Sequence, residues 1–140
     1  MANLRLDNLA RIGQLKSEPV AEEEIEGLFR SGIHRLDDAG REDLSLESRF
    51  DLGYNAAHSL ALAALRFHGY RSNSRYLVFQ CLQHTIGLPQ EQWRVLDDVH
   101  RKRNLAEYEG AMDIDGQLVA ALLRVAQEVA KRVGELVGLQ

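Results

Sequence analysis

The amino-acid sequence predicts an all-α protein: an antiparallel four-helix up-and-down bundle with one or two additional short helices. Three observations lead to this prediction. Apolar residues recur at the three- and four-residue spacing of a helix along most of the chain. The two prolines, Pro19 and Pro89, both fall between these periodic segments. No alternating apolar and polar run is flanked by turn residues in the way that marks a strand.

The length of the chain predicts one domain. It has 140 residues, of which 45% are hydrophobic and 27% charged, as in an ordinary globular protein. A chain of this size buries about two-thirds of the surface that it exposes when unfolded, so it needs neither a metal nor a disulfide to fold. We expect a single helical domain over residues 1–140, with N-terminal helices in 1–45 and a core in 46–137.

The period of the apolar residues places the individual helices. In the first, Leu6, Leu9, Ile12 and Leu15 would share one face. The third has an alanine-rich centre, which allows close approach of a neighbour and indicates the central helix. The last is apolar on more than one side, which fits either a deep central position or a second face buried against a partner chain. The predicted helices span residues 4–16, 20–38, 46–68, 75–86, 90–108 and 117–137.

Charge and cysteine content exclude several classes of protein. The chain has 17 basic and 21 acidic residues, so its net charge of −4 argues against a protein that coats DNA, although it allows a local basic patch. The single cysteine, Cys81, forms no internal disulfide and no paired zinc site, so we expect a cytoplasmic protein. No secretory signal and no run of 18 apolar residues is present, and no motif predicts a metal or cofactor.

One segment, residues 100–110, combines polar groups able to hold an anion. At helical spacing we expect His100, Arg103, Asn104 and Tyr108 to share one face with Glu107. An arginine can clamp a phosphate with two parallel hydrogen bonds, and an asparagine can orient a hydroxyl. The alternative is structural, with Arg103 paired to Glu107 one turn further on. A local basic patch adjoins the segment and can meet RNA phosphates or form a solvated helix face: Arg94, Arg101 and Lys102.

Arg103 and Asn104, followed by a ring residue five positions after the arginine, resemble the motif of the HEPN domain family. That motif is an arginine and a polar residue followed by a histidine. The resemblance covers residues 46–137, including the stretch 54–57, and implies a homodimer with its site at the interface. Many members are metal-independent endoribonucleases that act as toxins or in phage defence. The resemblance assigns catalytic roles to Arg103 and Asn104, whereas Tyr108 stands in place of the histidine.

The tyrosine changes the expected chemistry. An unperturbed tyrosine has a pKa near ~10 and is a poor base at neutral pH. His100, expected on the same face, is the alternative base. The first hypothesis is therefore an RNA- or nucleotide-directed toxin or defence component with weak or lost ribonuclease activity, whose partner is a cognate antitoxin.

The second hypothesis is a non-catalytic helical interaction module, and a third is an accessory subunit of a nucleotidyltransferase. An active site predicts that Arg103 and Tyr108 of two chains face each other across a cleft. An interaction module allows an internal carboxylate to neutralise Arg103.

Overall fold

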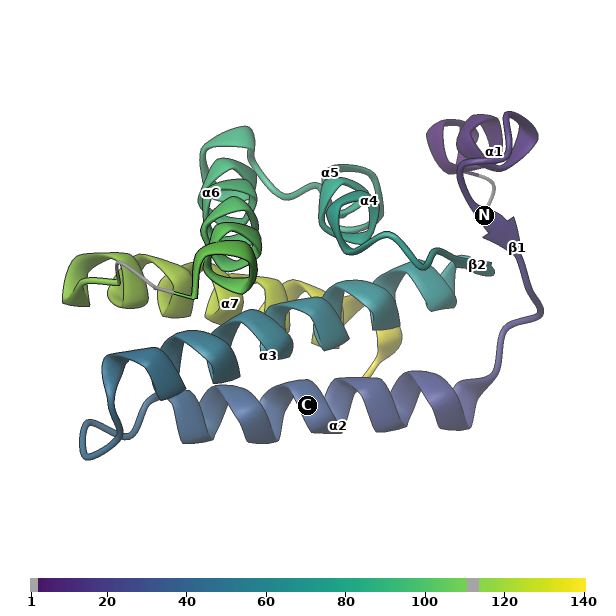
Figure 1. Cartoon of the computed structure of the whole chain (residues 1–140). Coiled ribbons are helices and arrows are strands. Elements are labelled where there is room, and N and C mark those ends of the chain that lie inside the picture. The colour runs from purple at the N-terminus through teal and green to yellow at the C-terminus, as the bar shows by residue number, and fades with distance from the viewer. Residues whose placement is uncertain (1–2, 111–113) are drawn as a thin grey trace.

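Three long helices, α2, α3 and α7, lie side by side and form the base of the fold (Figure 1). The structure is a computed structural model that describes residues 3–110 and 114–140. Most of these residues are helical, which confirms the all-α class. The helices are α1 (Leu4–Arg11), α2 (Glu22–Ala39), α3 (Leu46–Phe67), α4 (Arg75–Gln80), α5 (Leu82–Thr85), α6 (Gln90–Glu109) and α7 (Gly116–Val137). Two short strands, β1 (Lys16–Ser17) and β2 (Tyr70–Arg71), pair antiparallel.

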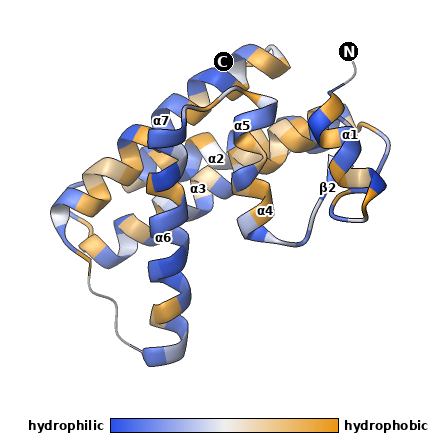
Figure 2. Ribbon diagram, turned by 90° about the horizontal axis from the view of Figure 1, so that it is seen from above, coloured by the Kyte–Doolittle hydropathy of each residue, from blue (hydrophilic) through white to orange (hydrophobic). Residues whose placement is uncertain are grey.

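The fourth long helix, α6, does not run alongside the other three. It stands steeply across them in Figure 1, and in Figure 2 it extends beyond the rest of the chain as a largely hydrophilic helix. The up-and-down arrangement predicted for four helices therefore does not describe α6. The chain changes direction twice before α6 begins. The first change is at Cys81, between α4 and α5, and the second is at Gly87, which adopts φ +65° two residues before Pro89.

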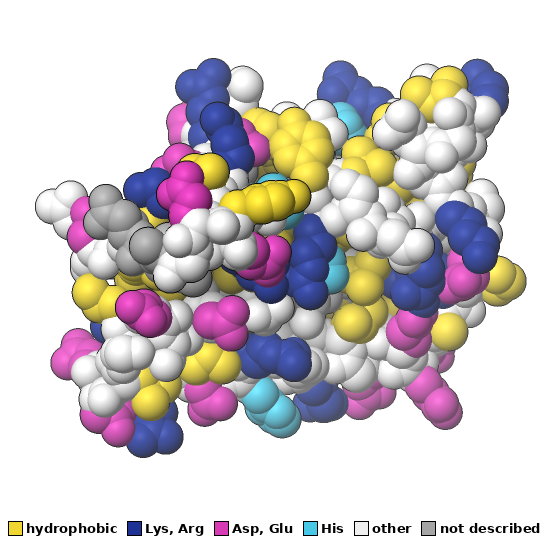
Figure 3. All heavy atoms as spheres, in the orientation of Figure 1, with side chains coloured by type: hydrophobic (Ala, Val, Ile, Leu, Met, Phe, Trp, Pro, Cys, Tyr) yellow, Lys and Arg dark blue, Asp and Glu magenta, His cyan; other side chains and the backbone are white. Residues whose placement is uncertain are grey.

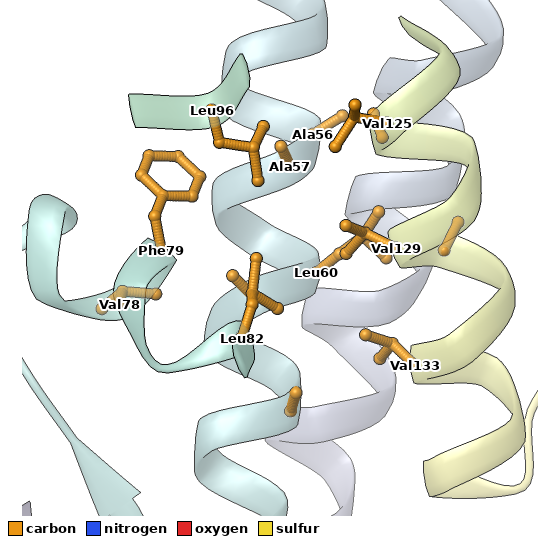
Figure 4. Close-up of a cluster of buried hydrophobic side chains, with 14 of the residues drawn as sticks. Ala56, Ala57, Leu60, Val78, Phe79, Leu82, Leu96, Val125, Val129 and Val133 are labelled. Atoms are coloured by element: carbon orange, nitrogen blue, oxygen red, sulfur yellow. The ribbon is translucent and has the colours of Figure 1, made fainter. Parts of the chain in front are cut away.

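The central position of α3 is confirmed. Its small residues Ala56 and Ala57 are fully buried, and Leu60 lies next to them. Figure 4 shows α3 between the valines of α7 on one side and side chains of α4, α5 and α6 on the other. The small residue Gly32 of α2 faces it closely, since a Cβ there would lie 2.6 Å from Cγ of Leu60.

The wide apolar surface of α7 is covered within the chain. Val119, Leu123, Ala126 and Ala130 are all buried, and α7 contacts α2, α3 and α6. Of the two explanations for this surface, the deep position in the fold accounts for these four residues without a partner chain.

The N-terminal segment differs from the prediction of one helix over residues 4–16. Helix α1 ends at Arg11, because Gly13 adopts φ +81° and the chain turns there. Ile12 is therefore 69% exposed, whereas Leu6 and Leu15 are buried on either side of the turn. The following residues form β1, which the sequence analysis did not predict. The predicted helix over 75–86 is also divided, into α4 and α5. The linker expected near 109–116 lies partly outside the described residues.

A cluster of four charged side chains connects this N-terminal segment to α3, and we call it the Arg66 cluster: Glu18, Glu24, Arg66 and Arg71. Arg66 is fully buried; its Nε lies 2.6 Å from Oε1 of Glu24, and its guanidinium also donates to the carbonyl oxygens of Glu18, Pro19 and Tyr70. Arg71 forms ion pairs with both glutamates. Hydrogen bonds from Arg71 lower the pKa of Glu18, and those from Arg66 and Arg71 lower the pKa of Glu24. This cluster fixes the chain before α2 against the end of α3.

Candidate functional site

Helices α3, α4 and α6 meet around one buried aromatic ring, Tyr54. The guanidinium carbon of Arg103 lies 4.6 Å from the centre of this ring, and that of Arg75 lies 5.5 Å from it. Arg75 is placed by the start of α4, where Ser74 caps the helix by accepting from the backbone N–H of Leu77. We call this group the Tyr54 cluster: Tyr54, Asn55 and His58 of α3, Arg75, Tyr76 and Phe79 of α4, and His100, Arg103 and Asn104 of α6.

His100 is hydrogen-bonded through both ring nitrogens. Its Nδ1 lies 3.0 Å from the hydroxyl oxygen of Tyr54, and its Nε2 lies 3.2 Å from the amide nitrogen of Asn104. Because that amide donates to Nε2, the neutral ring carries its proton on Nδ1 and donates to the tyrosine oxygen. Burial lowers the pKa of His100, and the nearby charge of Arg103 lowers it further. The neutral ring therefore has no unshared nitrogen lone pair to offer a substrate in this arrangement.

The second histidine of the cluster, His58, is also held neutral. Burial is the main cause that lowers its pKa to about 4, and the positive charges of Arg75 and Arg103 add to the effect. Phe79 lies between the two histidines, with its ring centre 5.9 Å from that of His58 and 6.0 Å from that of His100. A negatively charged ligand in this place would favour protonation of both rings.

The positive charge of the cluster is only partly balanced. Arg103 forms an ion pair with Glu107 at 3.2 Å, but the Glu107 side chain is 62% exposed. Arg75 donates to Oδ1 of Asn55 at 3.2 Å, and no carboxylate in residues 3–110 or 114–140 lies within ion-pair distance of it. Figure 3 shows basic and histidine side chains adjoining each other in the angle between α6 and α4. Of the two arginines, only Arg103 has an acidic partner, and the contribution of this solvent-exposed ion pair is small and easily replaced by a ligand.

The structure brings together three of the predicted site residues and separates the fourth. His100, Arg103 and Asn104 face the Tyr54 cluster, as their spacing predicts. Tyr108 is 92% exposed, so its ring is not packed into the cluster. It lies one turn beyond Asn104, in the last turn of α6, where that helix extends past the rest of the chain and residues 107–110 are all exposed. The structural expectation that Arg103 pairs with Glu107 is confirmed.

The predicted basic patch lies on the solvent side of α6. Arg94, Arg101 and Lys102 are all exposed. Arg101 forms an ion pair with Asp97, and this hydrogen bond is the main cause that raises its pKa. The structure does not bring this patch into the Tyr54 cluster. Arg94, Arg101 and Lys102 point to solvent, whereas the residues of α6 that belong to the cluster face α3 and α4.

Sequence reasoning missed the part of the cluster that comes from α3 and α4. Neither Arg75 nor Tyr76 was identified as part of a site. Their proximity to α6 depends on how three helices cross, and no spacing along the chain encodes it. Ser74 indicates where α4 begins, but nothing in the local sequence indicates which residues Arg75 contacts.

A groove of about 280 Å³ lies at a different place in the fold, between the ends of α2, α3 and α7. It is lined by Val20, Glu22, Ile25, Glu26, Phe67, Val137 and Leu139. Phe67 is more than two turns along α3 from His58, so this groove is separate from the Tyr54 cluster. In the part of the chain that the structure describes, no three His, Cys, Asp or Glu side chains are grouped to hold a metal ion, and no helix is long and apolar enough to cross a membrane.

Compared with protein-family models, curated proteins and solved structures, the chain matches none of them. The resemblance to the HEPN family therefore rests on the sequence motif alone.

Proposed function

We propose that the Tyr54 cluster binds a phosphate group of an RNA or a nucleotide, and that the chain is a HEPN-like toxin or defence component with weak or lost ribonuclease activity. One observation carries the proposal. The guanidinium groups of Arg75 and Arg103 converge on the Tyr54 ring, and the exposed carboxylate of Glu107 pairs with Arg103 alone. Arginines in such a position can bind phosphate oxygens through charge-assisted hydrogen bonds.

The positions of the two candidate bases support binding more than cleavage. Metal-independent cleavage of RNA needs a base to take the proton of the ribose 2′-hydroxyl as that oxygen attacks the phosphate. The basic nitrogen of His100 is occupied by Asn104, and the Tyr108 ring is exposed and not packed into the cluster. A base could then come only from a second chain in a homodimer. The activity test is therefore combined with analytical ultracentrifugation, which measures whether the free protein is a dimer.

The test compares the wild type with Arg103→Ala for binding to labelled single-stranded RNA and for its cleavage with a chelator present. We expect Arg103→Ala to weaken binding and to lower the slope of its salt dependence by about one. Arg30→Ala is the matched control, because Arg30 also pairs with a glutamate one turn away on an exposed helix surface, 3.0 Å from Glu26. Equal binding by the wild type, Arg103→Ala and Arg75→Ala would contradict the proposal.

A second candidate function is a non-catalytic interaction module, including an accessory subunit of a nucleotidyltransferase. The ion pair between Arg103 and Glu107 favours it, since the arginine already has an acidic partner within the chain. Glu107→Gln separates the two candidates. A phosphate site gains affinity for RNA when its competing carboxylate is removed, whereas an interaction module that does not bind RNA gains none.

A further inference from the structure

Tyr76 presents an aromatic ring at the rim of the Tyr54 cluster. It follows Arg75 directly on α4 and is 43% exposed, although two neighbouring rings of α6 support it. Its ring centre lies 6.3 Å from that of Trp93, with the planes at 71°, and 6.3 Å from that of His100, with the planes at 44°. Tyr76 is therefore held in place on one side and open to solvent on another.

The rings form a continuous path from this open surface to the arginines. Tyr76 contacts His100, the His100 ring is nearly parallel to the ring of Tyr54 at 13°, and Arg103 lies over Tyr54. The exposed ring of Tyr76 and the guanidinium of Arg103 are thus separated by two rings, those of His100 and Tyr54. A nucleotide has the same pairing of features, a flat base joined through a sugar to a phosphate.

This inference rests on the function proposed above. We propose that Tyr76 is a stacking residue for an unpaired nucleobase whose adjoining phosphate is held by Arg75 and Arg103. Base stacking on aromatic side chains is tolerant of sequence because every base has a π face. The bases of a duplex are already stacked on each other and are not available to such a ring. The ligand is therefore a single-stranded RNA segment rather than a duplex or a free phosphate.

The experiment separates base contacts from phosphate contacts. Fluorescence anisotropy measures binding of a short labelled oligouridylate and of an abasic ribose–phosphate strand of equal length and charge. We expect Tyr76→Ala to weaken binding of the oligouridylate by about 5- to 100-fold, the range for loss of one base–aromatic contact, and to leave the abasic strand unaffected. Tyr76→Phe should restore binding, since the ring and not the hydroxyl supplies the contact.

The controls distinguish failure of this inference from failure of the proposed function. Phe67→Ala removes an aromatic side chain of similar exposure, 38%, at the far end of α3 and should change neither affinity. Arg103→Ala should weaken the binding of both the oligouridylate and the abasic strand. If Arg103→Ala weakens both while Tyr76→Ala leaves the ratio of the two affinities unchanged, the stacking role is overturned and phosphate binding stands. If neither strand binds, or Arg103→Ala affects neither strand, both proposals fail together.

Discussion

Two pairs of arginines lie at different places along helix α3, and they differ in how their charges are satisfied. Near its C-terminal end, the Arg66 cluster sets two arginines against two glutamates, and Arg66 also donates to three backbone carbonyl oxygens. Nearer its middle, the Tyr54 cluster sets Arg75 and Arg103 against aromatic rings, neutral histidines and one exposed carboxylate. The first pair is balanced within the chain, and the second retains positive charge that faces solvent.

The difference separates a structural role from a binding role. A buried arginine is stable only when its donors are satisfied, so the partners of Arg66 are required by the fold itself. Arginines that lie over aromatic rings and remain partly exposed keep most of their capacity to bind an anion. The comparison predicts that changes in the Arg66 cluster affect the free energy of unfolding, whereas changes in the Tyr54 cluster affect binding and pH dependence.

The largest effect is expected from Arg66→Met. It leaves Glu24 without its closest buried partner and removes the donors to Glu18, Pro19 and Tyr70. Glu24 keeps its ion pair with Arg71, so the loss comes from the four hydrogen bonds of the buried guanidinium and should reach about 2–5 kcal/mol. Urea unfolding of the wild type and the variant measures this loss.

Arg103→Ala tests the other half of the comparison in the same experiment. The Glu107 side chain in its ion pair is largely exposed to solvent. The variant should therefore lose only about 1 kcal/mol of the free energy of unfolding. A cost as large as that of Arg66→Met would show that the two clusters share a structural role, and the distinction drawn above would be wrong.

The next effect is a dependence of stability on pH that His58 produces. In the unfolded chain His58 takes up a proton near its ordinary pKa of 6.5, but in the folded chain only near pH 4. Between these values the unfolded state binds more protons, so stability falls as the pH falls from 6.5 to 4. The loss at pH 4 should reach about 2–3 kcal/mol. The glutamates of the Arg66 cluster, whose pKa values are lowered from 4.5, begin to lose their contribution only as the pH falls through 4.5, at the lower end of this window.

Urea unfolding at a series of pH values measures this dependence. His58→Gln should remove its share of the loss, and His34→Gln, at an exposed position of α2, is the matched control. If the wild type and His58→Gln lose stability in parallel between pH 6.5 and 4, burial among Arg75, Arg103 and His100 is not the source of the effect.

The same two clusters show what the sequence predicted and where prediction stopped. Helical spacing correctly placed His100, Arg103 and Asn104 on one face, because that relation depends only on the helix that contains them. It did not predict that Tyr108, one turn beyond Asn104, is exposed, because the point at which α6 leaves its neighbours depends on tertiary packing. The contact between Arg75 and Tyr54 joins two helices, as does that between Arg66 and Glu24, so neither could be read from local spacing. The tilt of α6 likewise depends on tertiary contacts.

The smallest effect tests whether the hydrogen bond within the Tyr54 cluster holds His100 in place. Tyr54→Phe keeps the buried ring under Arg103 and removes only the hydroxyl that lies 3.0 Å from Nδ1 of His100. We expect a loss of about 0.5–1.5 kcal/mol in the free energy of unfolding, the usual contribution of one hydrogen bond. Tyr108→Phe, at an exposed position, should change it by less than about 0.5 kcal/mol. The variant also frees Nδ1 from the tyrosine, so the nitrogen chemical shifts of His100 should change while those of His34 stay constant. Unchanged shifts of His100 would mean that Asn104 alone orients the ring, and that the arginines of this cluster are positioned independently of the histidine beside them.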